Sequence, residues 1–161
     1  MRSSTGSRNP NALKDALVSG SGASVLSAVA LSVCSRLQEG SAAGALNGPS
    51  QWLWGEHEAY TRRATLRHTL VGYVIHHASS LLWGAFYERC FCRRGRRRSP
   101  ARIAAEAGLT AAIAYGVDYH LTPKRFRPGF KKHLGPGAIF AAYAAFAAGL
   151  AVVTVCRRKP L

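Results

Sequence analysis

Acidic side chains are scarce in this sequence. Asp and Glu number 7 among 161 residues, against 22 Lys and Arg, which gives a formal net charge of +15 and an isoelectric point near 10.7. Such an imbalance is typical of proteins that bind nucleic acid or lie in an anionic membrane. The positions of the cations favour a membrane, because they are clustered between long uncharged stretches instead of being spread along amphipathic faces.

Motifs for catalysis and metal binding are also missing. The sequence contains no phosphate loop, no H-E-x-x-H pattern and no nucleophile–base pair, which argues against an enzyme. Its four cysteines include a C-x-C pair, Cys90 and Cys92, which lacks the C-x-x-C spacing of common zinc and redox sites. We therefore expect no resident metal or cofactor, and reduced cysteines where they face the cytosol.

Long apolar stretches are what the sequence has in abundance. A bilayer core needs about 20 mostly apolar residues per helix, and four stretches come close to that length: 16–35, 69–87, 103–121 and 137–156. The third is the weakest, because it contains Glu106 and Asp118. Inserting an acidic residue into the membrane costs about 2.5–3.5 kcal/mol at a helix centre and less near the helix ends. We predict an all-α fold, an integral membrane four-helix bundle in one domain. A three-span arrangement with the third stretch at the membrane surface stays open.

Basic residues beside the predicted spans indicate the orientation. The tail 1–15, the connection 88–102 and the tail 157–161 together carry 13 Lys and Arg, whereas the other two connections carry 9. This distribution places both termini in the cytoplasm. A cleaved signal peptide ending at Ala28–Ala30 is the alternative, but the apolar character continues to Cys34 and favours an uncleaved helix.

Two adjacent histidines, His76 and His77, lie inside the second apolar stretch, in "GYVIHHASSLLWGAFY". Small residues recur at every fourth position on all four predicted spans, a pattern that lets helices approach closely in lipid. His76 falls on such a row, between Gly72 and Ser80. A ring facing lipid would leave its N–H without a partner, so we expect His76 to face the bundle interior.

The third span, running antiparallel, carries further polar side chains at the same depth. We predict an interior polar cluster of His76, His77, Asp118 and His120, with Tyr115 and Tyr119 as hydrogen-bond partners. Three interpretations stay open: interhelical hydrogen bonds of about 0.6 kcal/mol each, a proton-responsive site, and a bound metal or haem.

Two further groups of residues are predicted to contact the membrane surface. Trp52 and Trp54 follow a turn and fit an interfacial aromatic anchor. The run "RRGRRR" should contact anionic lipid at about 1 kcal/mol per basic residue near the surface; its arginines are Arg93, Arg94, Arg96, Arg97 and Arg98. Nucleic acid would also bind such a run. Arginine-rich loops are, however, common on the cytoplasmic side of membrane spans, so we expect no nucleic-acid partner.

Three segments, "LNGPSQWLWGE", "LRHTLVGYVIHHASSLLWGAFYER" and "VDYHLTPKRFRPGF", resemble a family of small uncharacterised four-helix inner-membrane proteins of proteobacteria. The resemblance runs from about residue 44 to residue 150 and implies a location without implying an activity. Lys131 departs from the family pattern, which has an acidic residue after "PGF". The matching positions are Asn47, Trp52, Trp54, His76, His77, Asp118 and Tyr119.

The sequence thus supports two functions of different classes. The first is a structural or accessory component of the envelope, with a membrane-protein partner or a second copy of the chain. The second is a small transporter or channel element, linked to protons or ions through the intramembrane histidines and aspartate.

Overall fold

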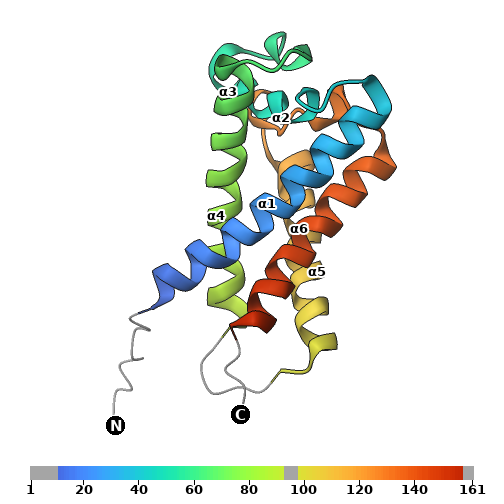
Figure 1. Ribbon diagram of the computed structural model, residues 1–161. Helices are drawn as coiled ribbons and strands as arrows, with labels where there is room; N and C mark the ends of the chain where they lie inside the picture. The colour runs from blue at the N-terminus through green and yellow to red at the C-terminus, as the bar shows by residue number, and fades with distance from the viewer. Residues whose placement is uncertain (1–10, 93–97, 158–161) are drawn as a thin grey trace.

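The computed structural model describes residues 11–92 and 98–157, and this part of the chain is helical with no strand. The four longest helices are α1 (Ala12–Glu39), α4 (Val71–Phe91), α5 (Pro100–Gly116) and α6 (Pro136–Cys156). They run alternately up and down (Figure 1), so α1 and α5 begin where α4 and α6 end. We call this the terminal end. The predicted all-α class is confirmed.

Short helices close the opposite end of the molecule, which we call the cap (residues 40–70 and 122–135). They are α2 (Gly44–Asn47), η1 (Gly48–Ser50), α3 (Gln51–Trp54), η2 (Glu58–Tyr60), η3 (Leu66–Leu70), η5 (Lys124–Phe126) and η6 (Phe130–Lys132). η3 leads into α4 and is a π-helical turn, as is η4 (Val117–Leu121), which prolongs α5. The buried amide of Asn47 joins the cap's segments, because it donates to the carbonyl oxygens of Thr61 (2.6 Å) and Arg63 (3.1 Å).

Local signals in the sequence fix the ends of the long helices. The Thr65 hydroxyl accepts a hydrogen bond from the His68 amide before α4, and Ser99 does the same for Arg102 before α5. α1 ends at Gly40, whose φ of +77° is a left-handed conformation that costs glycine little. Capping residues therefore mark the start of the helical segment that contains α4, the start of α5 and the end of α1.

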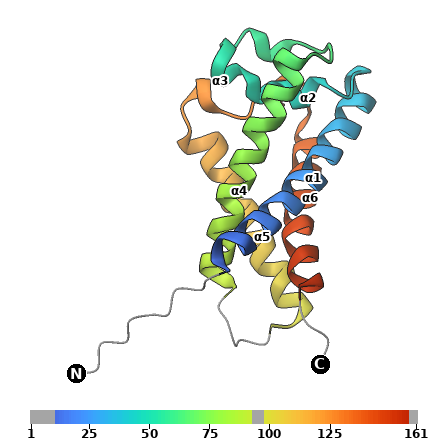
Figure 2. The ribbon, with the colours of Figure 1, turned by 60° about the vertical axis from the view of Figure 1, so that its left-hand side comes forward.

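α1 crosses the molecule diagonally between α4 and α6 (Figures 1 and 2) and packs along both of them. α5 packs along α6 and touches α4 only slightly. Helix packing is therefore close where α1 meets α4 and α6, and loose between α4 and α5.

Glycines bring α1 close to both of its neighbours. A Cβ added to Gly84 on α4 would lie 2.6 Å from the Gly20 Cα on α1, and one added to Gly149 on α6 would lie 2.5 Å from the Ala23 Cα. The predicted small-residue rows of α1 and α4 are thus in contact. The row predicted on the third span, Ala104, Gly108, Ala112 and Gly116, is not a close-contact face of α5, because a Cβ added to Gly108 or Gly116 would meet nothing within 4 Å.

The long helices also differ from the predicted spans. α1 is longer than the predicted 16–35 and includes part of the predicted tail 1–15, while the predicted third span combines α5 with η4. Two helices of the described chain, α1 and α6, are long and apolar enough to cross a membrane. α5 alone has 17 residues, and α4 carries two histidines and two serines in its apolar run.

Replacing Gly84 with alanine should destabilise the bundle, because the added methyl group would meet the α1 backbone. Overpacking of this kind costs about 1–3 kcal/mol. The matched control is Gly108→Ala, which adds the same group into open space and should leave stability unchanged or slightly raised. Thermal unfolding in mild detergent measures both, and equal midpoints for the two variants would contradict the close approach of α1 and α4.

Candidate functional site

A cavity lies directly beneath the cap, between α4 on one side and α5 and α6 on the other. Its empty volume is about 590 Å³, part of it open to the outside. Side chains from α1, α4, α6, η4 and the cap line it. The polar side chains among them are Ser27, His76, Ser79, Ser80, Asp118 and Tyr143, with Trp52 and Trp83 presenting indole rings.

The two histidines predicted to face the interior both contact α1. His76 Nε2 lies 3.0 Å from the Ser27 hydroxyl, and His77 Nδ1 lies 3.0 Å from the Ser24 hydroxyl, one helical turn away. His77 also stacks on Tyr73, with ring centroids 5.8 Å apart. Of the two, only His76 lines the cavity. The histidines therefore join α4 to α1, and one of them also faces the empty space.

Asp118 lines the same cavity, but its hydrogen-bond partner comes from α6, which contributed no residue to the predicted polar cluster. The Tyr143 hydroxyl on α6 donates to Asp118 Oδ2 at 2.6 Å. A signal for Tyr143 was present, because it is the one side chain able to hydrogen-bond between residues 137 and 153. Asp118 stands on the π-helical turn η4, a distortion that is frequent at functional sites.

The remaining members of the predicted cluster lie outside the cavity. His120 is exposed and contacts only the Tyr115 ring among the described residues. Tyr115 and Tyr119 pack together, and the Lys131 ammonium lies 4.2 Å from the centre of the Tyr119 ring. The structure therefore brings His76 and Asp118 together around one space and places His77, His120 and these two tyrosines elsewhere.

The two tryptophans predicted as an interfacial anchor have different surroundings. Trp52 lines the cavity and packs edge-on against Phe126, at 5.7 Å between ring centroids. Trp54 is exposed, donates its Nε1–H to the Arg67 carbonyl at 3.0 Å, and lies under the Arg67 guanidinium. Trp54 thus has the position of a surface anchor, while Trp52 belongs to the cavity wall.

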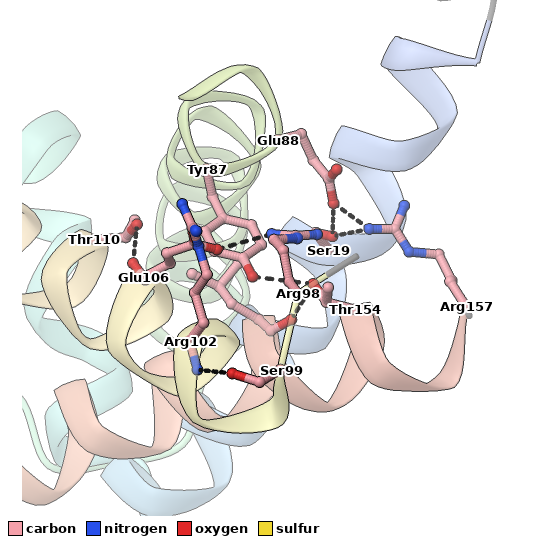
Figure 3. Close-up of polar contacts among 11 residues, drawn as sticks. Ser19, Tyr87, Glu88, Arg98, Ser99, Arg102, Glu106, Thr110, Thr154 and Arg157 are labelled. Atoms are coloured by element: carbon pink, nitrogen blue, oxygen red, sulfur yellow. Dashed lines mark hydrogen bonds and ion pairs between the residues drawn. The ribbon is translucent and has the colours of Figure 1, made fainter. Parts of the chain in front are cut away.

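One of the arginines predicted to contact lipid is instead buried in the terminal end. Figure 3 shows Arg98 and Arg102 converging on Glu106. Arg98 Nη1 lies 2.9 Å from Glu106 Oε2, with side chains 9% and 10% exposed, and Arg102 Nε lies 2.7 Å from Oε1. The lipid contact predicted for Arg98 is therefore wrong. The predictions for Arg93, Arg94, Arg96 and Arg97 fall outside the described residues.

A second ion-pair group ties the first and last helices to α4 at the same end. Arg157 pairs with Asp15 on α1 (2.9 Å) and with Glu88 on α4, and its guanidinium also donates to Ser19 at 2.8 Å. The Ser19 hydroxyl in turn donates to Glu88 (Figure 3). These contacts hold the ends of α1, α4 and α6 together.

The cap contains a buried polar centre that the sequence analysis missed. Glu39, with a side chain 7% exposed, accepts from the Ser35 hydroxyl and lies 3.0 Å from Arg62 Nε. His133 Nδ1 lies 2.8 Å from the same carboxylate, and its Nε2 faces the Ala59 carbonyl at 2.5 Å. Each buried group has a partner, so this centre stabilises the cap.

These pairs leave Asp118 as an exception. Four of the seven acidic side chains pair with arginine in the structure: Asp15, Glu39, Glu88 and Glu106. Glu58 lies 2.8 Å from His68 Nε2. Glu56 is exposed in the cap. Asp118 forms no ion pair with any described residue, although it lies partly buried beside aromatic rings.

Comparison of the chain with protein-family models, with curated proteins and with solved structures gives no match. The resemblance to proteobacterial inner-membrane proteins therefore stays a prediction. Within the described residues no three His, Cys, Asp or Glu side chains are grouped so that they could hold a metal ion. Function has to be inferred from the cavity and from the surface of the bundle.

Removing the Arg98 side chain with an Arg98→Met substitution should lower the free energy of unfolding by about 1–3 kcal/mol, because it leaves a largely buried carboxylate with one partner fewer. Arg102→Met is the matched control, since Arg102 is 45% exposed, and it should cost less than about 1 kcal/mol. Chemical denaturation in detergent measures both. An Arg98 variant as stable as the Arg102 variant would contradict the buried pair.

Proposed function

We propose that the protein is an integral, multi-pass component of a bacterial inner membrane, with a structural or accessory role and no catalytic activity of its own. The observation that carries this proposal is the distribution of large apolar side chains. Many of them are exposed on the outside of the four long helices, while small side chains occupy the closest helix crossings.

α1 illustrates the distribution. Its buried face consists of Leu31 and otherwise of small residues, among them Ser19, Gly20, Ala23, Ser24, Ser27 and Ala28. Its outward face carries Val25, Val29 and Val33, which are 50%, 55% and 52% exposed. A helix in water would bury the valines. In lipid their exposure carries no hydrophobic cost, and close packing through small residues stabilises the helix contacts.

The other long helices share this outward apolar surface, which would give them a lipid-facing role as well. Their large exposed apolar residues include Val74 and Leu82 on α4, Leu109 and Ile113 on α5, and Phe140 and Val152 on α6. A surface with large apolar side chains on all four long helices is typical of contact with lipid or with another protein. It supports four membrane passes, with α4 and α5 crossing as members of the bundle.

The distribution of charge supports the orientation. The described chain begins and ends at the terminal end, where α4 also ends and α5 begins, and the sequence from 88 to 102 carries seven Lys and Arg. Since positive residues accumulate on the cytoplasmic side, we place the terminal end in the cytoplasm and the cap outside. The partners that follow are anionic lipid and either a membrane protein or a second copy of the chain.

Extraction and labelling test this proposal. The protein should stay in the membrane fraction after alkaline carbonate treatment. In intact spheroplasts, a membrane-impermeant maleimide should label a single-cysteine variant carrying His57→Cys in the cap and should not label one retaining only Cys90 at the terminal end. Both positions are exposed. Cys92 is unsuitable as a reporter, because burial and the nearby charge of Glu88 raise its pKa to about 11.

Release of the protein by carbonate would overturn the membrane location. Labelling of Cys90 from outside, with protection of the cap position, would overturn the orientation and leave the location standing.

A second candidate function, proton- or ion-linked transport, is supported by the placement of His76 and Asp118 around one cavity. In proteoliposomes it predicts a pH-dependent ion flux that His76→Ala abolishes. His77→Ala is the matched control, since His77 makes an equivalent bond to α1 but does not line the cavity. Equal loss in both variants would assign the histidines to packing.

A further inference from the structure

The cavity beneath the cap has a single formal charge. Asp118 is the one carboxylate among its lining residues, and no Lys or Arg lines it. Tyr143 donates to Oδ2, while Oδ1 has no hydrogen bond to the described residues. A partly buried carboxylate without a cation is costly in free energy. A cation bound beside Asp118 would offset that cost.

Besides aliphatic and small polar side chains, the remaining wall contains six Trp, Tyr and Phe rings. They belong to Trp52 and Phe126 of the cap, Trp83 of α4, Phe130 of η6, and Tyr143 and Phe146 of α6. The face of an aromatic ring attracts cations, and this attraction grows when the cation has left water. Aromatic walls around a carboxylate are the arrangement that recognises a bulky, weakly hydrated ammonium group.

We infer that this cavity binds an amphipathic organic cation, a quaternary or protonated amine, with its positive group beside Asp118 and its apolar body against the aromatic wall. Part of the cavity is open to the outside, so a ligand whose apolar body extends beyond the enclosed space can still reach Asp118. The inference extends the proposed membrane location, because cations of this kind concentrate in anionic bilayers.

Other classes of ligand fit the cavity less well. An anion such as a phosphate or carboxylate would meet Asp118 and no compensating cation. A metal ion would need more ligands than His76 and Asp118 supply, and no group of three is present within the described residues. An uncharged lipid-soluble molecule would satisfy the aromatic wall and leave the carboxylate unpaired, so it is the competing occupant.

The test compares a cation with its uncharged isostere. Benzyltrimethylammonium and neopentylbenzene have the same shape and differ in the central nitrogen or carbon. Binding is followed by the fluorescence of Trp52 and Trp83 in a Trp54→Phe background, with the purified protein in uncharged detergent. We expect saturable binding of the cation, at least about tenfold tighter than that of the isostere.

Asp118→Asn should weaken cation binding by about tenfold or more and leave the isostere's affinity within about twofold, because asparagine can still accept from Tyr143. Glu56→Gln, which removes an exposed carboxylate outside the cavity, is the matched control and should change neither affinity. If Asp118→Asn does not fold, Trp83→Leu replaces it and should weaken the cation more than the isostere.

Equal binding of cation and isostere to the unaltered protein would overturn the inference in favour of an uncharged ligand. Unchanged cation binding in Asp118→Asn would overturn it as well, as would the absence of saturable binding. These outcomes are separate from carbonate extraction, which tests the membrane location on the unaltered protein without any ligand.

Discussion

The close approach of α1 to α4 and α6 is the contact on which the rest of the structure depends. It needs small residues at the crossing points, and Gly20, Gly84 and Gly149 supply them. Large side chains cannot occupy these crossing points, so they lie in the core beside them or on the outer surface. The same contact brings Ser24 and Ser27 within reach of the histidines of α4. Packing and polar pairing are thus two consequences of one geometry.

Acidic residues are scarce, and most of their carboxylates connect one part of the structure to another. At the terminal end they join helices through arginine, and in the cap Glu39 joins α1 to His133 and Arg62. Because carboxylates in the bundle otherwise meet a cation, Asp118 stands out by its surroundings more than by its sequence. Its π-helical turn, its tyrosine partner and the aromatic cavity around it are features of one site.

Much of the fold could be predicted from the sequence, and much of the site could not. Helix class and approximate bounds follow from apolar length and from caps such as Thr65 and Ser99. The inward position of His76 follows from its neighbours along the helix. Tyr143 was missed because its partner lies 25 residues away on another helix. The error at Arg98 has the same origin, since sequence position beside a span does not reveal a carboxylate within reach.

The sequence by itself determined what local forces control: helical segments, their capping residues, the small-residue rows of α1 and α4, and the clustering of positive charge. Tertiary structure alone decided which face of α5 packs, which of two neighbouring histidines meets empty space, and which carboxylate stays without a cation. The physical reason is that side-chain periodicity fixes directions relative to one helix axis. The rotation and separation of neighbouring helices, which decide what each side chain meets, depend on the packing of all the helices together.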